Sequence, residues 1–429
     1  MLFSLDVVRA RKGDCMLLHY GAEDDPRLII IDGGPRGVYA PHLKPRLEQI
    51  KQARGLEEND PLTVDLLMVS HVDDDHIQGI LDLTRDLTQD DPQFAQVLSF
   101  WHNSFENIIG NTPPELTAAF KSQFGPASIG GDPPDMTIDH EEEEEVIVSS
   151  LKVLASIQQG AQLRSDIVNK LDVPLNQEFE SGLILANEAG EALDMEDGLQ
   201  FTIVGPLLPE LKKLHEKHQE WLKELASKGK SADEVLSAYV DKSVPNLSSI
   251  VVLAEADGKR MLLTGDARGD KILEGLELVG LLEEGGQMHV DVLKVPHHGS
   301  SNNLDDDFFE RITADHYVFS GDGEHGNPER ESFEMLLNAR GTDDDYTIHL
   351  TYPVKELDAG RKADWAKEQS KEKKKQEKNP AKKVRANWSP KKHSLGALFE
   401  EHKDFGKKVS IVGENNEPHL INLLDEVGF

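Results

Sequence analysis

Short, almost wholly apolar runs that end in acidic or hydroxyl residues constrain the fold of this chain most strongly. Residues 28–31 run directly into Asp32, and residues 64–69 run directly into Ser70. Such runs are typical of strands that are covered on both faces of a sheet. Between the runs stand segments with apolar residues at helical spacing, for example residues 43–56. Strands that alternate with helices predict a layered α/β fold.

Length, charge and cysteine content limit the classes of protein to which the chain can belong. A chain of 429 residues exceeds the size at which single cores usually stop growing, so we expect more than one folding unit. The single cysteine, Cys15, excludes an internal disulfide framework and fits a reducing compartment. No run approaches the roughly 18 apolar residues of a membrane span, and the N-terminus lacks the order of a signal peptide. We therefore expect a cytoplasmic protein with no membrane partner.

The distribution of patterns along the chain predicts an organisation in two parts. Strand and helix patterns cover residues 1–345, except for a weakly patterned insertion at about 110–245. Residues 346–429 form a predicted C-terminal extension that includes the Lys-rich segment 361–392. That segment holds thirteen Lys or Arg and four Asp or Glu residues within a chain of net charge −33. We expect it to be a mobile helix or a solvated linker, or else a local site for nucleic acid, which the rest of the chain would repel.

The segment after the strand at 64–69 holds the residues with the clearest chemical meaning. It contains His71, Asp73, Asp75 and His76 within six positions. Imidazole nitrogen and carboxylate oxygen together suit zinc, manganese or iron, whereas calcium prefers oxygen alone. The sequence therefore predicts a metal-binding loop here, with an acidic surface loop as the alternative.

Two later strand ends carry residues of the same kind. Asp266 follows the strand predicted at 261–264, and His297 and His298 follow the strand predicted at 290–295. Residues at the ends of neighbouring strands meet at one edge of a sheet. The simplest interpretation is one metal-centred site at that edge.

These residues also resemble the motifs of a known family. The order His71-x-Asp73-x-Asp75-His76 is similar to the H-x-[HD]-x-D-H signature of the metallo-β-lactamase superfamily. The similarity is closer to the soluble hydrolase domain of the DNA-uptake channel protein ComEC and its free-standing relatives. Six pieces stand in the order of that family: residues 11–15, 31–34, 70–79, 246–251, 262–267 and 293–300.

The resemblance implies a four-layer αββα metallo-β-lactamase sandwich with a helical insertion and a C-terminal extension. It also implies two divalent metal ions, zinc or manganese, at one edge of the sandwich. The residues that it assigns to the metals are His71 and Asp73 for the first ion, Asp75, His76 and His298 for the second, Asp266 as a bridge, and His297 as a ligand or an orienting neighbour. Asp75 would also be the catalytic residue that takes a proton from the attacking water.

The chain departs from the superfamily pattern at the first metal. Asp73 replaces the second histidine of the signature, and Asn246 and Ser248 stand where a further histidine is expected. A site with fewer nitrogen ligands favours a harder ion such as Mn²⁺. His102 and His325 are the candidates for the missing nitrogen ligand.

These features predict a metal-dependent hydrolase, with phosphodiesterase or nuclease activity as the leading hypothesis. Nucleic acid would then bind through the Lys-rich segment, where Trp365 and Trp388 could stack on bases. One alternative is hydrolysis of a small ester, lactone, thioester or cyclic nucleotide. Another is a non-catalytic, metal-stabilised interaction module of a multi-gene defence system, with unknown protein partners.

Overall fold

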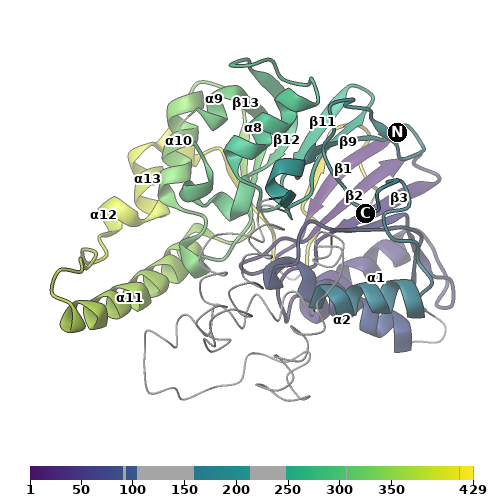
Figure 1. Ribbon diagram of the computed structural model, residues 1–429, viewed down its shortest axis with the longest axis horizontal. Helices are drawn as coiled ribbons and strands as arrows, with labels where there is room; N and C mark the ends of the chain where they lie inside the picture. The colour runs from purple at the N-terminus through teal and green to yellow at the C-terminus, as the bar shows by residue number, and fades with distance from the viewer. Residues whose placement is uncertain (90–92, 104–158, 213–247, 306, 415, 429) are drawn as a thin grey trace, which may run out of the picture.

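The computed structural model describes most of the chain (Figure 1). The described residues are 1–89, 93–103, 159–212, 248–305, 307–414 and 416–428. About half of the predicted insertion, including the helical patterns at 146–158 and 213–240, lies outside the described residues.

Two large sheets form the centre of the molecule (Figure 1). The six-stranded sheet has the order β16-β1-β2-β3-β5-β7, and the eight-stranded sheet has the order β15-β14-β13-β12-β11-β10-β9-β8. The strands of the first are β1 (Leu2–Val7), β2 (Met16–Gly21), β3 (Pro26–Ile31), β5 (Leu66–Val69), β7 (Phe100–His102) and β16 (Leu420–Asn422). Those of the second are β8 (Leu193–Asp194), β9 (Gln200–Gly205), β10 (Val251–Ala256), β11 (Lys259–Leu263), β12 (Met288–Lys294), β13 (Ile312–Phe319), β14 (Thr347–Leu350) and β15 (Val409–Ile411). A small sheet pairs β4 (Leu62–Val64) with β6 (Ala95–Val97).

The predicted strand at 64–69 is interrupted at Asp65, between β4 and β5. The Asp65 carboxylate accepts the backbone N–H of Leu28 at 2.9 Å and forms an ion pair with Arg27 at 2.8 Å. A carboxylate in a buried strand needs such partners, and the strand bends to provide them.

Helices cover the outer faces of both sheets. They are α1 (Lys44–Ala53), α2 (Asp74–Gln89), α8 (Gly269–Leu278), α9 (Phe308–Arg311), α10 (Arg330–Arg340), α11 (Val354–Lys378), α12 (Pro390–His393), α13 (Leu395–Glu401) and α14 (Lys403–Gly406). Shorter helical turns are η1 (Tyr39–Leu43), η3 (Asp166–Lys170), η5 (Pro296–Gly299), η6 (Ser301–Asn303) and η7 (Glu324–Gly326).

Three apolar cores define the order of the layers. One core joins the facing sides of the two sheets, with Phe3 and Ile29 from one and Phe201 and Val292 from the other. A second core packs α1 and α2 onto the six-stranded sheet, and a third packs α8, α9 and α10 onto the eight-stranded sheet. The layers therefore run helix, sheet, sheet, helix, and the predicted α/β class is confirmed.

The metal-site segments leave the sheets where parallel strands end. β3, β5 and β7 are parallel in one sheet, and β11 to β15 are parallel in the other. Parallel strands place the loops after their carboxyl ends at one edge, where ligands bind in open α/β sheets. The loops after β3, β5, β11, β12 and β13 all contribute to the centre described below.

Residues 346–429, predicted as a C-terminal extension, contribute strands to both sheets. β14 and β15 continue the eight-stranded sheet beside β13, and β16 pairs with β1 in the six-stranded sheet. The register pairs Leu5 with Ile421, so the last strand lies against the first.

The Lys-rich segment is helical as far as Lys378, where α11 ends. The chain then returns along the helix: Trp365 donates to the carbonyl of Ala386 at 2.9 Å, and Arg385 pairs with Glu372. The sequence allowed either a helix or a solvated linker for this segment, and residues 361–378 form a helix. Figure 1 shows α11 projecting from the body of the molecule.

Within the described part of the chain, none of the helices has the length and apolar character needed to cross a bilayer.

Candidate metal centre

The first part of the site is built where β3 and β5 end. Asp32 follows β3 and is fully buried. Its carboxylate accepts the backbone N–H and the hydroxyl of Ser70, both at 2.7 Å, and lies 2.8 Å from Nδ1 of His76. The Ser70 hydroxyl lies 3.1 Å from Nδ1 of His71. Asp32 and Ser70 thus contact the Nδ1 side of both imidazoles.

The segment that the sequence predicts as a loop up to residue 76 is partly helical. α2 begins at Asp74, so Asp75 and His76 stand in its first turn, and the expectation of a wholly irregular loop is wrong. Carboxylates are favourable near a helix N-terminus, because they interact with the unpaired N–H groups and the helix dipole. The carbonyl of Asp73 accepts the N–H groups of His76 and Ile77, which fixes the start of the helix.

The second part of the site comes from the other sheet. Asp266 follows β11, and His297 and His298 lie in the turn η5 after β12. Both histidines have positive φ, 47° and 53°, a conformation that residues other than glycine adopt at a cost. The surrounding contacts maintain this backbone: the N–H of His297 donates to the carbonyl of Gly265 at 3.1 Å.

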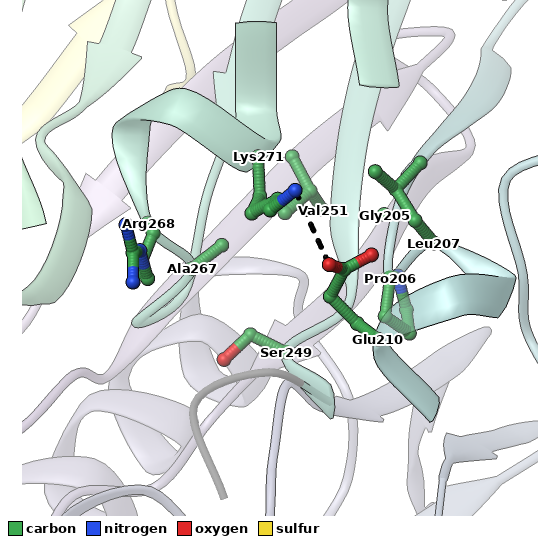
Figure 2. A pocket seen from close by; sticks show the side chains of 9 residues that line it. All are labelled: Gly205, Pro206, Leu207, Glu210, Ser249, Val251, Ala267, Arg268 and Lys271. Atoms are coloured by element: carbon green, nitrogen blue, oxygen red, sulfur yellow. Dashed lines mark ion pairs between the residues drawn. The ribbon is translucent and has the colours of Figure 1, made fainter. Parts of the chain in front are cut away.

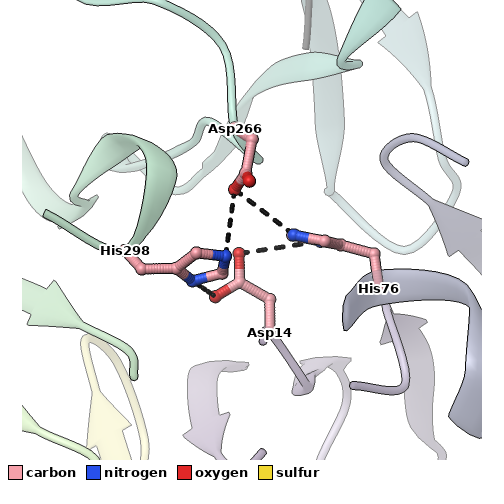
Figure 3. Close-up of side chains that lie close together, drawn as sticks. All are labelled: Asp14, His76, Asp266 and His298. Carbon is pink, nitrogen blue, oxygen red and sulfur yellow. Dashed lines mark ion pairs between the residues drawn. The ribbon is translucent and has the colours of Figure 1, made fainter. Parts of the chain in front are cut away.

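Asp266 lies among the imidazoles of four histidines, and each of its two carboxylate oxygens faces a different pair of them. Oδ1 lies 3.3 Å from Nε2 of His76 and 3.3 Å from Nε2 of His298 (Figure 3). Oδ2 lies 3.7 Å from Nε2 of His71 and 3.6 Å from Nε2 of His297. Ligand atoms about 2.1 Å from one ion are separated by roughly 3 to 3.5 Å. The separations at Oδ1 fall within this range, and those at Oδ2 are slightly longer, so the arrangement is suited to binding metal.

The remaining two predicted carboxylates lie at the open side of the centre. Asp75 places Oδ1 3.9 Å from Nε2 of His76 and Oδ2 3.8 Å from Nε2 of His298. Asp73 places Oδ2 3.7 Å from Nε2 of His71. Their side chains are 22% and 30% exposed. The other six residues that the sequence predicts for the metals thus lie around the seventh, Asp266.

Several buried polar atoms at this centre make no hydrogen bond with any other described protein atom. They are Nε2 of His71, His76 and His298, Oδ1 of Asp266, and Oδ2 of Asp14, which forms an ion pair with Lys294. Buried polar atoms normally have partners, and imidazole nitrogen with carboxylate oxygen is a donor set for Zn²⁺ or Mn²⁺. The residues present fit a bound metal. Two groups have ligand atoms within 4.8 Å of one another: Asp14, His76, Asp266 and His298, and His71, Asp75 and His76.

Four residues beside the centre were not among those predicted: Asp14, Asp32, Lys294 and Ser320. Asp14 lies 3.3 Å from Nδ1 of His298, which also lies 3.0 Å from the Ser320 hydroxyl. Asp14 and Asp32 are fully buried acids, each next to a glycine at one end of a strand. An acidic residue beside a glycine at the end of a predicted strand is the sequence feature by which both could have been predicted. Gly13 is required beside Asp14, because a Cβ there would lie 1.8 Å from the Asp75 carbonyl oxygen.

Neighbouring carboxylates control the protonation of His76 and His298. Burial alone would lower the pKa of each, because it disfavours the charged form. For His76, the carboxylates of Asp266 and Asp32 outweigh burial and hold the pKa well above its ordinary value. For His298, Asp266 and Asp14 raise the pKa to about 9. A metal must therefore displace protons from these two imidazoles.

At His71 and Asp73, burial and most of the neighbouring charges shift the pKa in the same direction, so the uncharged form of each side chain is favoured. Burial lowers the pKa of His71 well below its ordinary value, and the neighbouring His76 lowers it further. Burial together with the carboxylates of Asp75 and Asp266 raises the pKa of Asp73 to about 8. Closely spaced carboxylates favour a cation between them, so these shifts agree with a metal site.

The two candidates for a missing nitrogen ligand lie outside the groups described above. His102 ends β7, and its Nε2 would be 3.5 Å from a Cβ at Gly160. His325 is about half exposed and lies near Lys12 and Glu324. His297, which faces the same Asp266 oxygen as His71, is the better-placed nitrogen.

A small cavity of about 20 Å³ lies beside Ala267, the residue that follows Asp266 in the chain (Figure 2). Ala267 and Arg268 form one wall, and an ion pair between Lys271 and Glu210 at 3.2 Å crosses it. The Ser249 hydroxyl lines the pocket, is buried, and makes no hydrogen bond with a described protein atom.

Comparisons with known proteins do not establish a family for the chain. No protein-family profile matches it. Microtubule-associated protein futsch of Drosophila melanogaster is 39% identical over 64 residues, which are 15% of this chain and 1% of that protein. Microtubule-associated protein 1A of Rattus norvegicus is 31% identical over 116 residues, which are 26% of this chain and 4% of that protein. The chain therefore spans only a few per cent of the length of these curated relatives.

One solved structure is similar over most of the chain. Zn²⁺-bound PqqB from Methylobacterium extorquens has 13% sequence identity and a TM-score of 0.32, with 84% of each chain covered. A likeness of this degree carries no conclusion about the fold or the chemistry of this chain.

Proposed function

We propose that this chain is a metal-dependent hydrolase with two divalent ions at the Asp266 centre. The observation that supports this most is the convergence of three buried imidazole Nε2 atoms on one buried carboxylate, none of the three making a hydrogen bond with a described protein atom. We also propose that the chain belongs to the metallo-β-lactamase superfamily, because of its His71 to His76 signature and its layer order, and that it works in the cytoplasm.

The charge of the fully deprotonated cluster is consistent with two divalent ions. Its five carboxylates (Asp14, Asp32, Asp73, Asp75 and Asp266) and the ammonium of Lys294 give a formal charge of −4 when all are ionised and the histidines are neutral. Two divalent cations would cancel that charge, and without them protons on His76, His298 and Asp73 offset part of it. Buried charge without compensation is strongly unfavourable.

In this proposal, one set of residues binds the metal ions and another residue accepts a proton during hydrolysis. Bound divalent ions supply a water of lowered pKa and neutralise negative charge on the group under attack. His71, Asp73, His76, His298 and Asp266 hold those ions, with His297 beside them. Asp75 lies at the open side, partly exposed, where its carboxylate would take a proton from the attacking water.

We propose a phosphodiester as the substrate class, in nucleic acid or in a smaller molecule. The Lys-rich helix α11 favours a polymer, because it begins four residues after β14 ends, at the same edge of the sheet as the metal-site loops. A small ester or cyclic nucleotide is the second candidate, because the residues of the metal centre all precede α11, so a small substrate needs no contact with that helix.

Metal analysis joined to hydrolysis assays tests this proposal. Protein purified without chelator should contain close to two equivalents of zinc or manganese. It should hydrolyse bis-p-nitrophenyl phosphate, and single-stranded DNA if the substrate is a polymer. Chelation should abolish activity, and Mn²⁺ should restore it at least as well as Zn²⁺. A protein that binds neither metal would contradict the proposal.

A further inference from the structure

Lys294 is a fully buried lysine at the metal centre. It ends β12, four residues before His298, and its side chain has no exposed surface. Its ammonium forms an ion pair with Asp14, donates to the Gly265 carbonyl at 3.0 Å, and lies 3.9 Å from Oδ1 of Asp266. A buried ammonium is stable only with such partners. Lys294 therefore connects the loop before β2 with the turn that carries Asp266.

Asp14 lies between His298 and His76 and contacts Nδ1 of His298, the ring nitrogen opposite the one that faces Asp266 (Figure 3). One oxygen of Asp14 lies 3.3 Å from this Nδ1 and accepts the Ser320 hydroxyl. The other oxygen forms an ion pair with Lys294 and lies 3.9 Å from Nδ1 of His76. Asp14 is close enough to the cluster to be a ligand, but one of its oxygens already faces an imidazole and a hydroxyl, and the other already pairs with an ammonium.

We propose that Asp14 and Lys294 form a buried ion pair that positions His298 for the metal, and that Asp14 is not itself a ligand. This inference rests on the proposed metal site. The Nδ1 proton of His298 faces the Ser320 hydroxyl at 3.0 Å and Asp14 at 3.3 Å, and that hydroxyl itself donates to Asp14, so the Nε2 lone pair is left for the ion. Carboxylates behind a ligating histidine commonly fix its tautomer and orientation in this way.

Lys294 has two effects in this arrangement. Its ammonium holds the second oxygen of Asp14, which keeps that carboxylate from turning toward the ion. Its bond to the Gly265 carbonyl holds the turn that precedes Asp266. One residue thus positions a ligand from each of two strand ends, β11 and β12.

Three variants test the proposal: Lys294→Met, Asp14→Asn and the double variant. Zn²⁺ affinity is measured by competition with a chromophoric chelator, and thermal stability is measured separately in EDTA. Each single variant should keep both zinc equivalents at saturation but bind the weaker one 10- to 100-fold less tightly. Each should also melt at a lower temperature, because it leaves one buried charge without its partner. The double variant removes both charges, so it should recover part of the stability and none of the affinity.

The pair Lys259 and Asp291 provides the matched control. It joins β11 to β12 at 2.7 Å: Lys259 begins β11, at the end opposite Asp266, and Asp291 lies in the middle of β12. Lys259→Met and Asp291→Asn should leave zinc affinity unchanged.

Two results would overturn the inference while leaving the proposed function intact. In the first, the variants lose stability but keep wild-type zinc affinity, which would mean a purely structural pair. In the second, Asp14→Asn loses one zinc equivalent even at saturation, which would make Asp14 a ligand. If Lys294→Met does not fold, Asp14→Asn and the double variant still decide between these outcomes. Absence of zinc from the wild type would instead contradict the proposed function itself.

Discussion

The carboxylate of Asp32 lies 2.8 Å from Nδ1 of His76, and the opposite nitrogen of the same ring lies 3.3 Å from Asp266. His76 thus stands between a carboxylate that orients it and one that shares its proposed metal. His298 has the same arrangement, with Asp14 in the place of Asp32. Segments of the six-stranded sheet supply both orienting carboxylates and His76, and the eight-stranded sheet supplies His298, so the second pair depends on how the sheets pack.

Asp32→Asn should weaken metal binding without removing a ligand. The amide is similar in size to the carboxylate, but it does not stabilise the Nδ1–H of His76 with a negative charge. We expect a 10- to 100-fold loss of Zn²⁺ affinity, measured by chelator competition. Asp86→Asn, on the outer helix α2, is the control and should bind zinc as the wild type does. Unchanged affinity in Asp32→Asn would show that Asp32 only holds Ser70.

Asp75→Asn and Asp266→Asn should both remove most activity, with different effects on metal content. Asp266→Asn should lose metal, because Asp266 faces all four histidines of the centre. Asp75→Asn should lower the turnover number by about 10² to 10⁴ while the fold and most of the metal remain. Metal content is measured by mass spectrometry and turnover with bis-p-nitrophenyl phosphate. Full activity in Asp75→Asn would exclude Asp75 as the proton acceptor.

His297 should supply the nitrogen that the first metal lacks in the sequence. Its Nε2 and that of His71 face the same oxygen of Asp266, at 3.6 and 3.7 Å. We expect His297→Ala to lower the zinc content from two equivalents toward one after dialysis against metal-buffered solution. His325→Ala is the control, since His325 lies near Lys12. Loss of zinc in His102→Ala with none in His297→Ala would reverse the assignment.

We expect the free energy of unfolding to decrease in acid because of His349. This residue belongs to β14 and is not part of the metal centre. Nδ1 of His349 lies 2.8 Å from His419, and its Nε2 lies 3.0 Å from His316. Burial, together with His419 and His316, lowers the pKa of His349 to about 2. The unfolded chain takes up this proton below about pH 6.5 and the native protein does not, so stability falls as the pH drops below that value.

His349→Gln should remove this dependence. Between pH 6.5 and pH 5 the wild type should lose about 2 kcal/mol from this one group, and the variant should lose correspondingly less. Urea unfolding in EDTA at both pH values measures the difference without a contribution from metal. The exposed His289 provides the control variant, His289→Gln, which should behave as the wild type does. Equal acid sensitivity in His349→Gln would mean that His349 is protonated in the folded state.

The Lys-rich helix distinguishes a polymer substrate from a small one. Contacts between lysine and phosphate release counterions, so polymer binding through α11 should weaken steeply with salt. Neutralising Lys373, Lys374 and Lys375 to Gln should lower DNA cleavage at moderate salt and leave bis-p-nitrophenyl phosphate turnover nearly unchanged. Lys403→Gln with Lys407→Gln, at the first residue of α14 and directly after its end, is the matched control. Equal loss on both substrates would indicate a folding role, and no loss on either would favour the small-molecule alternative.

The sequence by itself determined which strand ends carry the proposed ligands and that the fold is α/β. Both follow from short-range patterns: apolar runs predict buried strands, and His71, Asp266 and His298 each stand within a few residues of a strand end. Only the tertiary structure decided the start of α2 at Asp74, the place of β14 to β16 in the two sheets, and the contacts of Lys294 with Asp14. Lys294 and Asp14 are 280 residues apart, and a lysine in an apolar run has no local signal that names its partner. Burial makes such a charge unfavourable without a counter-charge, and the packing of one sheet on the other brings that counter-charge to it.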